Sequence, residues 1–412
     1  MVSIIPPEVE NIDTSFFGAV IVIPQIQPIE EGFADVILQQ GGDISRRLDM
    51  LRIEKFPPNA EKTLRRFPLA EAATFLGVSP SYLKKLHSQG KGADPFVTPT
   101  GRRYYTGEQM NILRETLGRS PRRQPGEKLQ IISVVNFKGG SGKTTTAVHL
   151  SQFLSLRGFR VLVVDLDPQA SLTALFGIQP EIDRNRSFYD VLRYDGERKT
   201  IRDVIRPTNF PDLHIVAANL ELQEYEYETP LAMRDGGAGR TFFTRVGDAL
   251  KEIDSEYDVI VIDCPPQLGY LTLTALTAST SVLITIHPQM LDIMSMSQFL
   301  LMLGEVLKSI EATGAAVSLD WFRYLVTRFE PGDIPQQEMV GLMQSMFARQ
   351  MLRTPMLKST AISDAGLTKQ SLYEVDRSEF NSQTYDRARE SIDSVFEEVI
   401  SLLSASWGRE KA

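Results

Sequence analysis

A glycine-rich loop between an apolar segment and a helix is the feature that most constrains the fold of this chain. The loop reads Lys138-Gly139-Gly140-Ser141-Gly142-Lys143-Thr144-Thr145 and directly follows the continuous apolar run at 131–137. Such a run is typical of a parallel strand buried on both faces. Glycines let backbone N–H groups turn inward around phosphate oxygens, and the N-terminus of the next helix adds partial positive charge. The sequence therefore predicts a strand, a phosphate-binding loop and a helix, in that order.

The two lysines of this loop have different expected roles. Lys143 supplies a point charge to the terminal phosphates of a nucleotide, and the Thr144 hydroxyl is a ligand for Mg²⁺. The general pattern G-x-x-x-x-G-K-[ST] fails at its first position, because Phe137 stands there and a second lysine, Lys138, opens the loop. The nucleotide-binding residues are predicted to be Lys138, Gly139, Gly140, Ser141, Gly142, Lys143, Thr144 and Thr145.

Carboxylates follow two further apolar segments. Asp165 and Asp167 come at the end of the run that starts at Val161, and Asp263 ends the run that starts at Val259. Ligands bind at the carboxyl edge of parallel sheets, where acidic groups hold Mg²⁺ and orient water. The alternative for each single carboxylate is a helix cap or a solvated turn. With strands also expected at 281–286 and 324–327, the sequence predicts an α/β fold with a doubly wound, mostly parallel sheet.

A helix-turn-helix pattern precedes this region. Gly77 permits a tight turn, Ser79 is a good N-cap and Pro80 suits the first helical position. A turn of this kind sets the crossing angle at which the second helix of such a pair enters a DNA major groove, and the hairpin expected after it is typical of a wing. The alternative is a helical hairpin with no DNA role. The predicted DNA-binding residues are Ser81, Tyr82, Lys84 and Lys85 on the second helix, with Arg102 and Arg103 on the wing.

Charge supports a nucleic-acid partner for that region. Residues 61–128 hold 13 Lys and Arg against 6 Asp and Glu, in a chain whose net charge is −8. A basic module within an acidic protein points to phosphate, although a solvated basic surface is the alternative.

The single cysteine excludes an intramolecular disulfide. No uninterrupted apolar run approaches the length of about 20 residues that a membrane helix needs, and no signal peptide is apparent, so we expect a cytoplasmic protein.

Three domains are expected. Residues 1–60 form an N-terminal segment in which Ile44, Leu48 and Leu51 mark an amphipathic helix, a candidate for dimerisation. Residues 61–127 form the smaller helical winged helix-turn-helix domain, and residues 128–412 form the ATPase domain. The role of residues 1–40 stays open.

The loop with two lysines is the deviant Walker A motif, and the chain resembles the ParA/MinD group of P-loop ATPases. The region 67–117 resembles the winged helix-turn-helix module of the MerR type, so the whole resembles the type Ia branch of ParA partition proteins. Five stretches, among them His287-Pro288-Gln289-Met290-Leu291-Asp292 and Asp364-Ala365-Gly366-Leu367-Thr368-Lys369-Gln370, resemble more narrowly the RepA-type ATPases of repABC plasmids.

This resemblance implies ATP and Mg²⁺ as ligands and Lys138, Lys143 and Asp167 as catalytic residues. Lys138 would reach the ATP of a partner subunit, and Asp167 would position the attacking water. Thr144, Asp165 and Asp263 would support the Mg²⁺ and its waters.

The resemblance also implies an ATP-dependent homodimer that binds nucleoid DNA without sequence preference and responds to a centromere-binding partner of the ParB or RepB type. The winged domain would repress its own operon. Arg353, Lys358 and Lys369 are candidates for non-specific DNA contacts. Two rivals remain: a nucleotide-sensing repressor with no motor role, and a MinD-like ATPase recruited to membranes. The acidic C-terminal helix, with Glu390, Asp393, Glu397 and Glu398, counts against the second.

Overall fold

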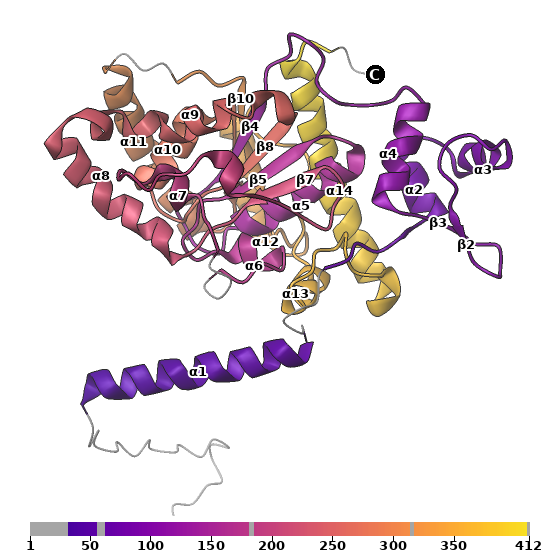
Figure 1. Ribbon diagram of the computed structural model, residues 1–412, viewed down its shortest axis with the longest axis horizontal. Helices are drawn as coiled ribbons and strands as arrows, with labels where there is room; N and C mark the ends of the chain where they lie inside the picture. The colour runs from indigo at the N-terminus through magenta and orange to yellow at the C-terminus, as the bar shows by residue number, and fades with distance from the viewer. Residues whose placement is uncertain (1–31, 56–61, 181–184, 314–316, 410–412) are drawn as a thin grey trace, which may run out of the picture. The chain divides into compact units, whose positions relative to one another are not determined.

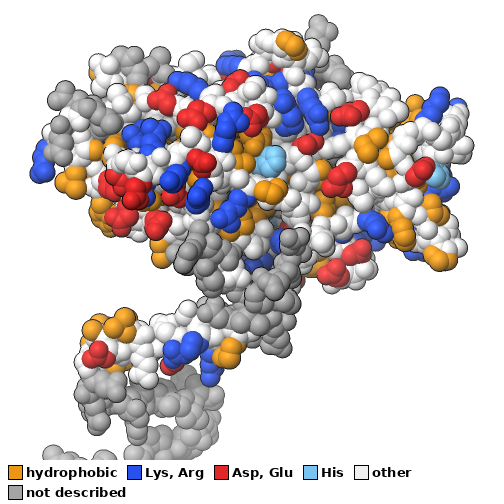
Figure 2. Space-filling view, viewed as in Figure 1, with side chains coloured by type: hydrophobic (Ala, Val, Ile, Leu, Met, Phe, Trp, Pro, Cys, Tyr) orange, Lys and Arg blue, Asp and Glu red, His pale blue; other side chains and the backbone are white. Residues whose placement is uncertain are grey.

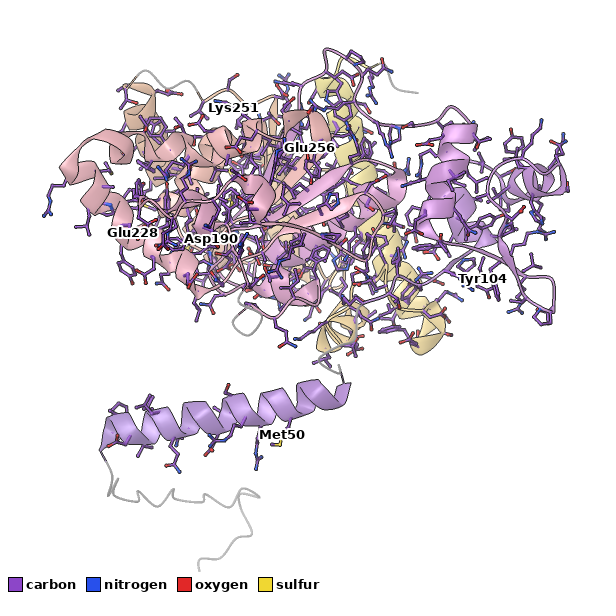
Figure 3. The ribbon with its side chains drawn as sticks, viewed as in Figure 1. Met50, Tyr104, Asp190, Glu228, Lys251 and Glu256 are labelled. Carbon is purple, nitrogen blue, oxygen red and sulfur yellow. The ribbon has the colours of Figure 1, made fainter. Side chains whose placement is uncertain are left out.

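The computed structural model describes residues 32–55, 62–180, 185–313 and 317–409 (Figure 1). The chain divides into two compact units, residues 1–60 and residues 61–412. The first unit contains the helix α1 (Phe33–Lys55), which begins earlier than the apolar spacing predicted and continues through Gly41 and Gly42. Met50 is exposed within this unit (Figure 3). The side chains of Leu48 and Leu51, and the predicted domain boundary at residue 60, lie outside the described residues.

A seven-stranded sheet forms the centre of the second unit. Its strand order is β10-β9-β4-β8-β5-β7-β6, and every neighbouring pair is parallel except β6 with β7. This confirms the doubly wound, mostly parallel α/β fold; the edge strand β6 and its neighbour β7 were not predicted. The strands are β4 (Gln130–Val135), β5 (Val161–Asp165), β6 (Ile205–Pro207), β7 (Leu213–Val216), β8 (Val259–Asp263), β9 (Ser281–Ile286) and β10 (Trp321–Val326).

Side chains alternate between the two faces of this sheet, and each face has its own core. Ile132 and Val134 of β4 pack into one core, while Ile131 and Val135 pack into the other. The first core includes residues of α5 (Lys143–Arg157), α6 (Ser171–Leu175), α13 (Thr360–Leu367) and α14 (Ser382–Ser406). The second includes residues of α7 (Tyr189–Leu192), α8 (Glu224–Asp235), α9 (Arg245–Lys251), α10 (Tyr270–Ala278), α11 (Met290–Glu311) and α12 (Ile334–Phe347).

Short 3₁₀ helices complete the connections on this unit. They span Ile201–Asp203, Leu220–Gln223, Gly237–Thr244, Asp254–Glu256 and Arg377–Glu379.

The winged module lies at the start of the second unit, beside α14 (Figure 1). It contains α2 (Leu69–Leu76), α3 (Pro80–Ser88), α4 (Gly107–Thr116) and a small sheet of β1 (Phe67–Pro68), β3 (Arg103–Tyr105) and β2 (Phe96–Val97). The side chain of Ser79 accepts a hydrogen bond from the backbone N–H of Tyr82, and Gly77 ends α2 in a left-handed conformation. Thr106 and Gln109 form a capping box at the start of α4. The helix, turn, helix and hairpin of the prediction are therefore all present.

This module shares its hydrophobic core with the face of the sheet that carries α5 and α14. Phe75 of α2 lies 6.3 Å from Phe153 of α5 between ring centroids, in an edge-on arrangement. The connection at 118–126 is held by hydrogen bonds: the backbone N–H of Arg123 donates to Asp258, and the Arg409 guanidinium donates to the carbonyl of Pro121. The module is thus packed into the second unit rather than suspended from it.

One helix in the described part of the chain is long and apolar enough to cross a membrane by length and composition, namely α11. The sequence analysis counted only uninterrupted apolar runs and missed it, because Asp292 and several serines interrupt this segment. Its residues Ile293, Met296, Phe299, Leu303 and Ile310 pack into the core of the second unit. A core helix of a soluble protein passes the same test, so this single helix is weak evidence for a membrane span.

Candidate nucleotide-binding site

A pocket of about 520 Å³ opens at the carboxyl edge of the sheet, around the glycine-rich loop. The loop residues from Gly139 to Thr145 line one side of it, and Asp167 lines another. The loop follows β4 directly, and α5 begins at Lys143, so the helix N-terminus faces the pocket. The predicted loop residues are brought together here, with the exception of the Lys138 side chain.

Glycine is required at two positions of the loop. Gly140 and Gly142 have φ values of +76° and +85°, in the left-handed region that other residues rarely adopt. A Cβ atom at Gly142 would also lie 3.3 Å from Cβ of Thr327. The Thr327 hydroxyl donates a 2.7 Å hydrogen bond to the carbonyl of Ser141, and Arg328 donates a 2.9 Å hydrogen bond to the carbonyl of Gly140. The two residues that follow β10 therefore fix the backbone of the loop.

The two lysines of the loop lie apart. Nζ of Lys143 donates to the carbonyl of Lys138 at 3.2 Å and lies under the loop. Burial lowers the pKa of Lys143, while the carboxylates of Asp263 and Asp167 act in the opposite direction. The ammonium of Lys138 instead pairs with Asp292, at the first turn of α11, and this side chain does not line the pocket.

Asp263 is a fully buried carboxylate beside Thr144 and Lys143. It ends β8, next to β4, and neither of its carboxylate oxygens accepts a hydrogen bond from the described residues. Burial raises its pKa well above the usual range, and the neighbouring Asp165 carboxylate adds to this, whereas Thr144 and Lys143 oppose it. A buried carboxylate beside a threonine hydroxyl is a donor set that suits Mg²⁺ and its waters. Among the described residues, no group of three or more His, Cys, Asp or Glu could hold a metal.

Asp165 is also buried, but its oxygens are engaged. They accept hydrogen bonds from the backbone N–H and the hydroxyl of Thr173, at 2.9 and 2.7 Å, and from the N–H of Asp167 at 3.1 Å. Burial raises its pKa to about 7. Asp167 lies at the pocket and accepts one hydrogen bond, from the N–H of Gln169 at 3.0 Å. Burial raises the pKa of Asp167, and Lys143 opposes this shift.

Sequence reasoning missed the far wall of the pocket. It is formed by residues after β10 and around the start of α13, none of which belongs to a recognised motif. The one available signal was Thr327-Arg328, because polar residues that end a parallel strand lie at the ligand edge. Lys358, predicted as a DNA contact, belongs to this wall and pairs with Glu330 at 2.9 Å. The wall consists of Thr327, Arg328, Met356, Leu357, Lys358, Ser359, Ile362 and Ser363.

The predicted DNA-binding residues lie on the winged module and not at this pocket. Ser81, Tyr82, Lys84 and Lys85 are exposed on α3, whereas Leu83 and Leu86 are buried beneath them. Arg102 is exposed in the hairpin turn and Arg103 is half-buried at the start of β3, next to Tyr104 (Figure 3).

A strand, a glycine loop, a helix N-terminus and a buried carboxylate on the neighbouring parallel strand define the class of P-loop nucleotide-binding proteins. A family model described as an AAA domain matches residues 129–313. A protein named as a replication protein A from Sinorhizobium fredii is 60% identical over 399 residues, which cover 94% of this chain and 98% of that protein. The chain belongs to the ParA family of partition ATPases.

Two more distant similarities agree with this assignment. A ParA family protein from Chlamydia trachomatis is 28% identical over 267 residues, covering 64% of this chain and 97% of that protein. A solved structure called Partition Protein has a TM-score of 0.62 with 20% identity, covering 89% of this chain and 98% of that chain, and it supports the fold.

Proposed function

We propose that this chain is an ATP-hydrolysing plasmid partition protein that works as an ATP-dependent homodimer. The observation that carries the proposal is the meeting, at one edge of the sheet, of the loop lysine Lys143, the buried carboxylate of Asp263 and the pocket carboxylate of Asp167. Phosphoryl transfer depends mainly on position and charge, and these three groups supply both.

ATP would bind with its phosphates in the loop from Gly139 to Thr145. The backbone N–H groups and the N-terminus of α5 would bind the phosphate oxygens, and Lys143 would turn from the carbonyl of Lys138 to the terminal phosphates. Thr144 and, through water, Asp263 would hold Mg²⁺, which when bound neutralises phosphate charge.

Asp167 is the residue that we assign to the attacking water. One of its oxygens accepts the N–H of Gln169, so the other is available to a water in the pocket. The carboxylate oxygens of Asp165 already accept hydrogen bonds from Thr173 and from the N–H of Asp167. We therefore assign Asp165 to orienting the backbone at Asp167, rather than to direct contact with Mg²⁺.

Lys138 would complete the site of a second subunit, since its side chain does not line the pocket of its own chain. The closed dimer would bind nucleoid DNA without sequence preference, through a salt-dependent contact with phosphates. A centromere-binding partner of the ParB or RepB type would stimulate hydrolysis and release the dimer. The protein would then be cytoplasmic and associated with the nucleoid.

The winged module would bind operator DNA and repress the partition operon. The exposed side chains of α3 are suited to a major groove, and Arg102 and Arg103 of the hairpin to flanking phosphates. The basic charge of this module, within an acidic chain, favours the same partner.

The test is ATP hydrolysis by the full chain under four conditions: alone, with DNA, with the neighbouring ParB-type protein, and with both. We expect a low basal rate that rises most with both. The Lys143→Ala variant serves as the control for contaminating ATPase, because it removes the phosphate charge. A flat response, with nucleotide changing only operator binding, would contradict the partition role and favour a nucleotide-sensing repressor.

A further inference from the structure

The N-terminus of α10 is capped by a carboxylate from another helix. Gly269 occupies the N-cap position of α10 and has no side chain that could cap it. Glu226 of α8 supplies the acceptors instead. Its two carboxylate oxygens accept hydrogen bonds of 2.9 Å from the backbone N–H groups of Tyr270 and Leu271. A carboxylate at a helix N-terminus also interacts favourably with the helix dipole, so this half-buried side chain ties the start of α10 to α8.

Residue 269 has to be glycine because of this cap. A Cβ atom on Gly269 would overlap with the carboxylate of Glu226, to which the three nearest atoms all belong. The φ value of Gly269 is −101°, which any residue can adopt. The position of the carboxylate, and not backbone strain, therefore excludes a side chain here.

Glu226 is held by a fixed frame. The buried hydroxyl of the preceding residue, Tyr225, donates a 3.1 Å hydrogen bond to the carbonyl of Phe242. Thr274 of α10 donates to the same carbonyl at 3.1 Å, and the ring of Phe242 lies edge-on to that of Tyr270 with 5.0 Å between centroids. The two helices thus meet at one point, and Glu226 fixes the direction of the α10 N-terminus relative to it.

The start of α10 carries one wall of the nucleotide pocket. Residues 264–269 connect it to Asp263 at the end of β8. The hydroxyl of Thr272 donates a 2.6 Å hydrogen bond to the carbonyl of Gln267, so the first turn of α10 holds this connection. Within the connection, Pro266 lines the pocket. The position of the α10 N-terminus therefore sets the wall that is nearest in the chain to Asp263.

We propose that Glu226 is a positioning residue for ATP hydrolysis. By holding the N-terminus of α10, it keeps residues 264–269 and Asp263 in place for Mg²⁺ and the attacking water. This proposal rests on the proposed hydrolysis of ATP. Glu226 is not among the described residues that line the pocket, so its contribution is geometric, and a displacement of about 1 Å can lower a rate by about 100-fold. Thr327 and Arg328 fix the phosphate loop separately, so nucleotide binding should not depend on Glu226.

The first test follows the cap without any nucleotide. Amide hydrogen exchange of the full chain is measured by mass spectrometry for the peptide that contains residues 264–272. Glu226→Gln keeps the shape of the side chain but directs an NH₂ group at one of the two N–H groups, so exchange in this peptide should become about ten-fold faster. Asn381→Ala, which removes the cap of α14, is the matched control and should leave this peptide unchanged. Equal exchange in Glu226→Gln and the unaltered chain would overturn the proposal.

The second test separates positioning from stability. In Glu226→Ala a side chain fits at residue 269, and the added substitution Gly269→Ser caps α10 from its own N-cap position. The melting temperature should then recover, whereas kcat should stay about 10- to 100-fold below that of the unaltered chain, because the connection to α8 is still missing. The dissociation constant for ADP should be unchanged throughout. Recovery of kcat together with the melting temperature would reduce Glu226 to a structural cap.

Gly269→Ala is an independent check if Glu226→Ala does not fold. The new Cβ displaces the carboxylate, so this variant should lower kcat as much as Glu226→Gln does, and the two substitutions together should lower it no further. Additive losses would mean that the two residues act separately, against the proposal. Failure of the proposed function is distinguishable: absence of hydrolysis in the unaltered chain, with faster exchange in Glu226→Gln, would refute that function while the cap is confirmed.

Discussion

The guanidinium of Arg114 donates a 2.7 Å hydrogen bond to the carbonyl of Leu156, and so connects the last helix of the winged module to the C-terminal end of α5. Arg114 is 4% exposed, and a second bond of 3.4 Å reaches the carbonyl of Phe75 at the end of α2. A cation at two helix C-termini interacts favourably with both helix dipoles. Since the N-terminal end of α5 follows the glycine-rich loop, one helix joins the nucleotide pocket to the winged module.

Replacing Arg114 with Met should destabilise the protein by about 2–4 kcal/mol, because it leaves buried helix carbonyls without a donor. Burial lowers the pKa of Arg114 to about 10, so the side chain is charged at neutral pH and its loss also removes the dipole interaction. The measurement is urea unfolding. Arg119→Ala is the matched control, since Arg119 caps the carbonyl of Gly77 from an exposed position and should cost less than about 1 kcal/mol. Equal losses of unfolding free energy in the two variants would refute the stabilising role of the buried hydrogen bonds of Arg114.

Gly158→Ala should be destabilising for two reasons. The residue has a φ of +97°, and the new Cβ would lie 2.6 Å from Cδ and Nη1 of Arg114. We expect a loss of about 2 kcal/mol in the unaltered chain. In an Arg114→Ala background the steric part disappears, so the two substitutions should be non-additive. Additive losses in urea unfolding would mean that the guanidinium can move away without cost.

Asp167→Ala should abolish ATP hydrolysis while ATP-dependent association persists. Positioning the attacking water typically contributes about 10²- to 10⁴-fold to the rate, whereas the phosphate contacts of Lys143 and the loop remain. Steady-state hydrolysis and sedimentation with ATP and Mg²⁺ check the two halves of this prediction. Lys143→Ala should lose both activities, and an Asp167→Ala variant that behaves in the same way would remove the assigned role.

Lys84→Ala combined with Lys85→Ala should weaken binding to operator DNA and leave ATP hydrolysis intact. Both side chains are exposed on α3, so their loss costs little stability. If both contact phosphates, the slope of log affinity against log salt should fall by about two. Lys251→Ala, on α9 (Figure 3), is the control for charge alone. Unchanged operator footprints in the double variant would refute a recognition role for α3.

His149 makes the protein sensitive to acid. Its Nδ1 lies 2.8 Å from the carbonyl of Thr145 and its Nε2 accepts from the N–H of Leu372, and burial lowers its pKa to about 4. The unfolded chain, with a histidine pKa of about 6.5, binds the proton first as pH falls. The stabilising contribution is therefore complete above that value and decreases by about 2 kcal/mol at pH 5. Urea unfolding at pH 7 and pH 5 measures this, and His149→Gln should flatten the difference; an unaltered pH dependence would exclude His149 as its source.

The strands at the centre of the sheet were predictable because they are continuous apolar runs with β-branched residues, as in β4 and β8. The strands β7 and β6 were not: β7 has four residues and β6, at one edge of the sheet, contains Pro207, so neither carries a clear pattern. The winged module was predictable from local chemistry alone, since the Ser79 cap and the Thr106 capping box need only neighbouring residues.

Long-range pairs were beyond the reach of sequence patterns. Glu71 of α2 accepts hydrogen bonds from Arg65 and from Arg389 of α14, and burial of that arginine is tolerated because Asp393 also faces it. Charged residues such as these look like solvated surface positions in the sequence. The partner of Lys138 is of the same kind, because the pairing with Asp292 depends on the order of β4 and β9 in the sheet.

Charge is unevenly distributed on the surface as well. In the space-filling view, acidic side chains gather over the region of α8, whereas the other end of the molecule, with the winged module, carries fewer of them (Figure 2).

The contacts of Phe75 with Phe153 and of Arg114 with α5 have a practical consequence for anyone who wishes to replace the winged module. A foreign module joined at residues 118–126 in place of the winged module would leave Phe153 and Tyr373 uncovered and the C-terminal end of α5 uncapped. An altered module must therefore keep α2 and α4 unchanged, and only the exposed residues of α3 and of the hairpin can be replaced.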